Sequence, residues 1–142
     1  MKLELVTLAG VKFQEEVYEV VLPTSTGDIA VFPNHMPLVT LAAPGVISVR
    51  RKAGTPDSDM EHFATNGGVI EIGNDFVRVL VDEADKADDI VESEAREALE
   101  RARQMREEAQ DSVSLERAQA LVDRQAVRLK VAEIRRRHHH GR

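Results

Sequence analysis

The stretch Gly27–Gly45, GDIAVFPNHMPLVTLAAPG, decides how the first half of this 142-residue chain folds. It alternates short apolar runs with proline-containing turns, and it carries a polar tip at Pro33-Asn34-His35. Proline fixes φ near −65° and has no N–H for a sheet ladder, so prolines at this spacing favour strand ends and turns. The stretch therefore predicts two short strands, Asp28–Phe32 and Leu38–Leu41, joined by an exposed loop that is used for binding.

Strand signals of the same kind continue on both sides, up to about residue 87. The further runs are Leu3–Val6, Val17–Leu22, Val46–Arg50, Met60–Ala64, Val69–Ile72 and Phe76–Val81. Turn formers separate them: Pro44-Gly45 predicts a type II turn and Asn66-Gly67-Gly68 predicts a hairpin turn. Together these signals predict an N-terminal antiparallel β-sandwich domain over residues 1–87.

Residues 88–142 contain no proline and change to helical periodicity. Steps of four and three residues predict two helices that face each other, with a break at residues 110–114. The predicted seam consists of Val91, Ala95, Ala98, Ala102, Met105 and Ala109 in the first helix, and of Leu115, Ala118, Val122, Gln125, Leu129 and Ala132 in the second. Alanine buries little area, so we expect this C-terminal antiparallel two-helix hairpin, residues 88–142, to be able to open away from the β-domain.

Composition narrows the function classes. The chain has no cysteine, which excludes disulfides and thiolate chemistry, and no apolar run approaches the roughly 18 residues of a membrane span. Residues 88–142 carry twelve acidic and twelve basic residues, so the whole net charge of −6 lies in residues 1–87. The end of the chain, residues 124–142, has seven basic residues against one acid. Such an end suits RNA, acidic lipid or an acidic protein surface, or it is an ordinary solvated helix end.

A search for catalytic motifs finds no phosphate loop, zinc-binding HExxH pair, nucleophile elbow or dinucleotide fingerprint. His35 has no partner carboxylate that sequence can identify. Three successive helical residues point in different directions, so His138-His139-His140 predicts no dedicated metal site. We therefore expect no catalytic residue, no cofactor-binding residue and no metal ligand.

Several segments match one family pattern in order and spacing over nearly the whole chain. They are Gly27-Asp28-Ile29, Pro33 to Leu38, Pro44-Gly45-Val46, Gly67 to Glu71, Val77 to Asp82 and Arg128 to Ile134. On these residues the chain resembles the epsilon subunit of bacterial F-type ATP synthases, the counterpart of the mitochondrial delta subunit. Glycine is usual in that family at Ala30 and Asn34, so we expect a somewhat different loop shape there.

The resemblance implies a non-catalytic rotor subunit in the central stalk of the CF(1) sector, with a role in hydrogen ion transport and ATP synthesis. It implies a peripheral position at the cytoplasmic face of the bacterial cell membrane, with membrane contact only through the complex. The implied partners of the sandwich are the gamma subunit and the ring of c subunits, with Asp28 and His35 as contact residues. The hairpin, when extended into the alpha/beta head, would inhibit ATP hydrolysis through beta-subunit contacts of Arg117, Arg124 and Arg128.

Some members of that family bind ATP through an I/L-D-x-x-R-A motif that opens the first helix. In this chain Val91 stands where the motif has Asp and Glu94 where it has Arg. A carboxylate at Glu94 repels phosphate, so we expect no ATP binding and no other cofactor.

Two rival classes are weighed against the stalk subunit. One is a stand-alone β-sandwich binding module whose basic hairpin contacts nucleic acid or an acidic partner; a nucleic-acid module is expected to interleave aromatic residues, and residues 77–142 contain none. The other is a small enzyme, which needs a convergent acid, base or nucleophile cluster. Co-purification with gamma separates the stalk subunit from both.

Overall fold

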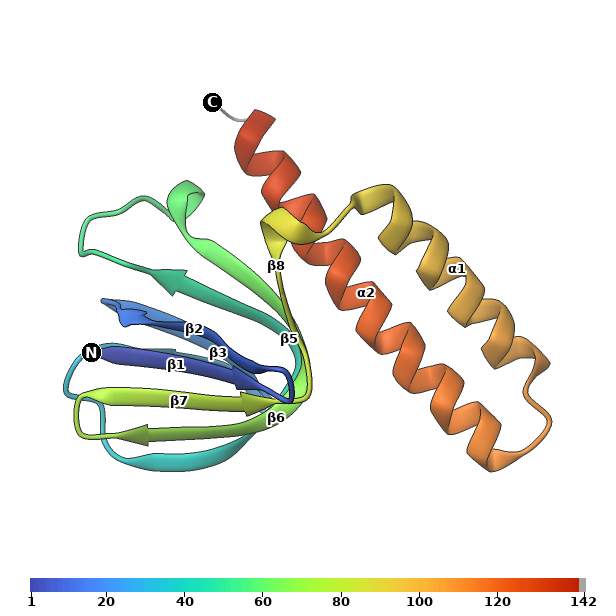
Figure 1. The fold of residues 1–142 in the computed structure, drawn as a ribbon, viewed down its shortest axis with the longest axis horizontal. Helices are drawn as coiled ribbons and strands as arrows, with labels where there is room; N and C mark the ends of the chain where they lie inside the picture. The colour runs from blue at the N-terminus through green and yellow to red at the C-terminus, as the bar shows by residue number, and fades with distance from the viewer. Residues whose placement is uncertain (141–142) are drawn as a thin grey trace.

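The fold runs from a folded β-sheet into a pair of helices, of which the second lies against the outer side of the sheet (Figure 1). The computed structural model describes residues 1–140, with side chains as far as His138. The strands are β1 (Lys2–Thr7), β2 (Gly10–Glu16), β3 (Glu19–Thr24), β4 (Gly27–Val31), β5 (Leu38–Arg50), β6 (Glu61–Gly73), β7 (Phe76–Val81) and β8 (Ala84–Lys86). A 3₁₀ turn, η1 (Asp57–Asp59), precedes β6, and a second, η2 (Ala87–Asp89), follows β8. The two helices come last: α1 (Glu92–Glu108) and α2 (Ser112–His140).

The strands form one sheet in the order β2-β1-β7-β6-β5-β3-β4, with β8 on the free part of β6. This confirms the predicted sandwich, in which the sheet folds over to make two layers. The prediction of purely antiparallel pairing is wrong at one place, because β1 pairs with β7 in parallel. Alternation along a strand shows which face is buried, but it does not identify a neighbour some 70 residues away. The strand β2 was not predicted either, because Phe13 is its only buried residue.

Both layers are built by the long strands β5 and β6, which bend together through about Ala42–Gly45 and Thr65–Gly68. Their register is continuous from Leu38↔Ile72 to Val49↔Glu61. The turns predicted at Pro44-Gly45 and Asn66-Gly67-Gly68 are therefore wrong, because both segments lie inside paired strands. Glycine is needed here for a different reason: Gly68 has a φ of 152°, and a Cβ at this position would overlap the carbonyl oxygen of Leu80.

Apolar residues that alternate along the strands fill the space between the layers. The fully buried ones include Leu3, Leu5, Val20, Leu22, Val31, Ile47, Phe63, Ile70, Val77 and Val79. Phe13 closes one side of this core with its ring 5.6 Å from that of Phe63, in an edge-to-face arrangement.

The predicted two-helix hairpin is confirmed, with Ala95, Ala102, Ala118, Val122 and Gln125 buried as expected. Three seam predictions are wrong: Val91, Met105 and Leu115 are about half exposed. Val91 precedes the first turn of α1, and Met105 and Leu115 lie near the connection between the helices. Leu99, which the predicted seam left out, is buried against Ala102 and Val122.

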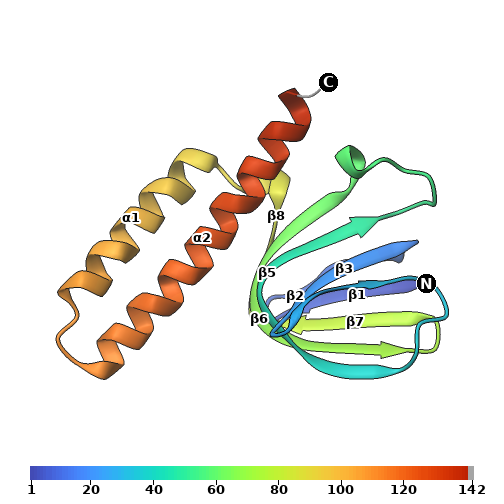
Figure 2. The same ribbon diagram turned by 180° about the vertical axis from the view of Figure 1, so that it is seen from behind.

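The hairpin contacts the sandwich mainly through α2, and most of α1 lies on the far side of α2 (Figures 1 and 2). A small apolar cluster joins the two parts: Ala64, Ala87, Ile90, Ala95, Val131 and Ala132. In this structure the hairpin is therefore docked. No helix among the described residues has the length and apolar character that a bilayer crossing requires.

Candidate functional site

A row of apolar side chains crosses the outer face of the sheet, on the layer built by β2, β1, β7, β6 and β5. The strand register places its members directly opposite one another: Val11, Val6, Leu80, Val69 and Leu41. Leu41 is 67% exposed and Val11 is 61% exposed. Five adjacent strands span roughly 19 Å at the usual strand spacing. This apolar row is a continuous surface that water covers in the isolated chain, which is typical of a protein contact site.

A charged row runs beside the apolar row, two residues along each strand. Arg78 holds Glu4 at 3.1 Å and Glu71 at 3.3 Å, so one guanidinium links three strands. The hydrogen bond that Arg78 donates to Glu4 is the main cause that lowers the pKa of the Glu4 carboxyl. The ion pairs therefore hold the charged side chains in place beside the apolar row, and they do not cover the apolar row itself.

The predicted ring-contact residues lie at the start of strand β4 and in the loop that follows it. Asp28 is exposed and faces Pro23 across the β3–β4 hairpin. His35 lies in the loop after the other end of β4, where its Nδ1 is 2.7 Å from the carbonyl oxygen of Met36. Asn34 adopts a φ of 69° there, so the position that is glycine in the family pattern keeps the left-handed backbone with an asparagine.

Two of the predicted regulatory arginines are engaged by the sandwich. Arg124 forms an ion pair with Glu83, and Arg128 Nε lies 3.1 Å from Asp85 Oδ2. The second contact has the distance of an ion pair without the alignment of a hydrogen bond. Both acids lie in the segment that leads from β7 into β8. Glu83 and Asp85 thus form an acidic clasp for α2, and its side chains are 47% and 36% exposed.

The third predicted arginine, Arg117, is exposed near the connection between α1 and α2. The structure records no ion pair for it among the described residues. The structure therefore does not group the three arginines: two are held by the acidic clasp and one faces solvent.

The start of α1 holds the residues of the altered nucleotide motif. Val91 is the N-cap residue and makes no side-chain capping bond, and Glu94 is exposed. Glu92 is engaged by Arg136 at 3.0 Å and by Arg96 at 3.0 Å. These contacts tie the two helices together at the end of the hairpin nearest the sandwich.

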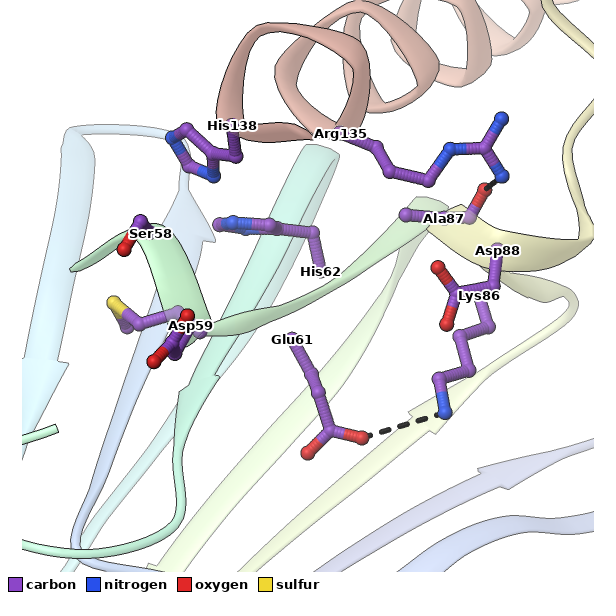
Figure 3. Close-up of a pocket in the computed structure, with 10 residues that line it drawn as sticks. Ser58, Asp59, Glu61, His62, Lys86, Ala87, Asp88, Arg135 and His138 are labelled. Carbon is purple, nitrogen blue, oxygen red and sulfur yellow. Dashed lines mark hydrogen bonds and ion pairs between the residues drawn. The ribbon is translucent and has the colours of Figure 1, made fainter. Parts of the chain in front are cut away.

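A cavity of about 240 Å³ lies where the last turns of α2 pass over β6, η1 and η2 (Figure 3). His62, Lys86, Arg135 and His138 reach it from three different elements. No group of three or more potential metal ligands occurs in the part of the chain that the structure describes. Of the three histidines at the end of the chain, His138 lines this cavity, while the side chains of His139 and His140 lie outside the described residues.

Sequence reasoning missed the residues that hold the hairpin down. Arg135 donates hydrogen bonds to the carbonyl oxygens of Ala87 at 2.7 Å and Ile90 at 3.2 Å. The acidic clasp was missed as well. A signal was available, since a run of acids between residues 82 and 89 precedes a hairpin whose second helix ends in a basic segment.

Both parts of the chain are similar to known proteins. Residues 1–87 match the family model described as ATP synthase, Delta/Epsilon chain, beta-sandwich domain. The chain is 35% identical to the ATP synthase epsilon chain of Herpetosiphon aurantiacus, with 96% of each chain covered. It is 37% identical to the ATP synthase epsilon chain of Dehalococcoides mccartyi, covering 97% of this chain and 96% of that one.

Solved structures share the fold. A chain in the cryo-EM structure of the Euglena gracilis mitochondrial ATP synthase, OSCP/F1/c-ring, superposes with a TM-score of 0.77 at 22% identity. That match covers 92% of this chain and 79% of the other. A chain of the Tetrahymena thermophila mitochondrial ATP synthase central stalk/c-ring structure gives a TM-score of 0.61 at 11% identity. At these identities the likeness concerns the fold, helices included.

Proposed function

Because the chain belongs to the ATP synthase delta/epsilon family, we propose that it is a non-catalytic subunit of the central stalk, which turns with the rotor and couples proton translocation to ATP synthesis. The match to epsilon chains extends over both the sandwich and the hairpin. The alternative of a stand-alone module that contacts nucleic acid is not favoured, because the relatives that cover the whole chain are subunits of the synthase. We place the protein peripherally, at the cytoplasmic face of the membrane.

The apolar row is the observation that carries this function. A rotor subunit must be fixed to the shaft, and an apolar surface that crosses five strands gains free energy when a partner removes it from water. We assign the gamma subunit to this surface. The neighbouring charged row would border the contact and fix its register.

The gamma assignment is tested with Leu41→Asp, which places a charge at the β5 end of the apolar row. We expect this variant to lose capture by immobilised gamma, because an unpaired carboxylate cannot be buried there without a large cost. Leu115→Asp is the matched control, since Leu115 is also an exposed leucine but lies at the far end of the hairpin. Equal capture of both variants would place the gamma contact elsewhere.

The ring contact is assigned to two polar residues, Asp28 at the start of the edge strand β4 and His35 in the loop after it. Neither side chain is in an ion pair within the described residues, so both are available to a partner. In this proposal the c ring meets the β3–β4 hairpin and the loop after β4.

We assign a regulatory role to the hairpin. In the docked state the acidic clasp occupies Arg124 and Arg128. When the hairpin extends, the same arginines become free to meet an acidic segment of the beta subunit, and ATP hydrolysis is inhibited. The hairpin is thus an element with two positions, each of which offers these arginines an acidic partner.

A variant at Arg117 can test the extended position of the hairpin without changing the docked one. It has no ion pair in the docked state, so Arg117→Glu should weaken only the extended, inhibited state. We expect this reversal to raise ATP hydrolysis by the reconstituted head while ATP synthesis changes little. Arg101→Glu, at an exposed position of α1, is the control for a charge reversal on the hairpin. If Arg117→Glu inhibits as strongly as the control and the parent, Arg117 takes no part in the extended state.

ATP itself is not assigned to this chain. Glu94 stands where the family motif carries a cation, and Glu92 beside it already holds Arg96 and Arg136. We therefore propose that ATP does not set the position of this hairpin, and equilibrium dialysis with ATP tests the point directly.

A further inference from the structure

His62 is enclosed between strand β6 and the last turns of α2 (Figure 3). Its Nδ1 is 2.9 Å from Ser48 Oγ, the residue opposite it on β5. Its Nε2 is buried and has no hydrogen-bond partner among the described side chains. A neutral imidazole with one unsatisfied nitrogen tolerates this site, whereas an imidazolium needs a partner for each of its two N–H groups.

The helix that covers His62 brings basic side chains toward it. The ring of His138 lies 5.7 Å from the ring of His62, centroid to centroid. Arg135 is one helical turn earlier on the same face of α2, and it anchors that turn to the carbonyl oxygens of Ala87 and Ile90. The C-terminal end of α2 is thus seated directly over a histidine, and a second histidine and an arginine approach it from above.

Two of the acids near His62 have basic partners of their own. Glu61, the neighbour of His62 on β6, holds Arg51 and, at 3.4 Å, Lys86. Asp57 on η1 is paired with Arg50. The titratable and charged groups that surround His62 are Glu61 on β6, Asp57 and Asp59 on η1, Lys86 on β8, Asp88 on η2, and Arg135 and His138 on α2.

We propose that His62 is a proton-operated latch: while neutral it lets the end of α2 lie on the sandwich, and when protonated it drives that end away. The inference goes beyond the proposed function, because it concerns how α2 is held within this chain and stands whether or not the hairpin inhibits hydrolysis. Release of the end of α2 would also remove Arg135 from its two carbonyl oxygens.

The sign of the pH dependence follows from the docked geometry. Burial, and then the neighbouring His138, lower the pKa of His62 below its usual value of 6.5. Release returns the ring to water, so the released state binds more protons than the docked state at mildly acidic pH. The ratio of docked to released chains therefore falls as the pH drops below about 6.5, by up to about tenfold per pH unit until the docked pKa is reached. Above about pH 7.5 the ring is neutral in both states and contributes no pH dependence.

The absence of cysteine in the chain allows a direct test on the full-length protein. Spin labels at Ala53→Cys and Arg137→Cys, both at exposed positions, report the distance between the β5–η1 loop and the end of α2. We expect a single short distance at pH 8 and a growing long-distance population at pH 5.5. His62→Gln, which cannot titrate, should keep the short distance at both values, whereas the control His35→Gln should behave like the parent.

The proposal is overturned if the parent keeps one distance at both pH values, or if His62→Gln releases α2 as the parent does. An NMR titration of the His62 ring in the unmutated chain gives a second test that needs no variant of this residue. The midpoint must lie below 6.5, and the resonances of Val131 and Ala132 must shift with it. A titration of His62 that leaves those resonances unchanged would also refute the latch.

Discussion

Neutralising the acidic clasp should shift the hairpin from its docked to its released position. The double variant Glu83→Gln, Asp85→Asn keeps the shape and polarity of both side chains and removes the two charges that Arg124 and Arg128 meet. The arginines stay intact, so their capacity to contact an acidic partner in the extended state is unchanged. This distinguishes the variant from reversal of the arginines, which weakens both positions at once.

The magnitude follows from the exposure of the two pairs. The arginine side chains are 36% and 28% exposed and the acids 47% and 36%, so water screens both pairs. Exposed pairs of this kind contribute about 0.2 to 1 kcal/mol each, and we take about 1 kcal/mol for the two together. That value corresponds to roughly a fivefold fall in the ratio of docked to released chains. The spin-label pair at residues 53 and 137 measures this ratio. Steady-state ATP hydrolysis by the reconstituted head should fall together with the ratio of docked to released chains, because the released hairpin is the inhibitory one.

The control removes two acids that hold nothing. Asp82→Asn with Asp89→Asn changes the net charge by the same amount, and both side chains are exposed without a recorded hydrogen bond or ion pair. The reasoning fails if the control and the clasp variant populate the released state equally, because net charge alone would then set the equilibrium. A second test raises the salt concentration to about 1 M, where the screening length is about 3 Å. The reasoning also fails if the parent then stays fully docked and the clasp variant has the same docked population as the parent.

Three other variants test the remaining assignments. Asp28→Lys with His35→Ala should lower proton-coupled ATP synthesis in membrane vesicles without changing the circular dichroism spectrum; full coupling would remove both residues from the ring contact. Gly68→Ala should cost about 3 kcal/mol or more in denaturant unfolding, because strain at a φ of 152° adds to a backbone overlap, whereas Gly10→Ala, with a φ of 122° and no atom near the new Cβ, should cost about 1 kcal/mol. Residues 1–87 alone should unfold cooperatively and still be captured by gamma, since α2 covers mainly small residues of the sandwich; a disordered spectrum would move the boundary.

The sequence predicted the parts of the fold that depend on local pattern. Alternation found the buried faces of most strands, and the change to steps of three and four found the helices, because both patterns report directly which side chains face a core. The errors occur where one pattern has two structural meanings. Pro44-Gly45 and Gly67-Gly68 look like turns, yet here they allow two paired strands to bend together from one layer into the other.

The candidate site could be predicted only in part. The individual residues of the apolar row are visible in the sequence, but the row exists only through the pairing of five strands, one of them parallel. The same holds for the partners of Arg124 and Arg128. A basic helix face predicts an acidic partner, and the sequence could not show that a partner lies within the chain, 41 and 43 positions earlier.

The small residues at the docking interface explain why the hairpin can have two positions. Of the six buried side chains in the cluster between the hairpin and the sandwich, four are alanines. The burial of Ile90 and Val131 contributes about 1.5 to 3 kcal/mol each, and Val46, Val127 and Leu129 pack against the cluster partly buried. The ion pairs add about 1 kcal/mol, and Arg135 adds two hydrogen bonds of about 0.5 to 1.5 kcal/mol each. Ordering the hairpin against the sandwich opposes these gains. An interface built mainly from alanines therefore opposes release with less apolar burial than one built from leucine and isoleucine, which favours a hairpin that a competing acidic surface, a change of salt or a protonation at His62 can shift.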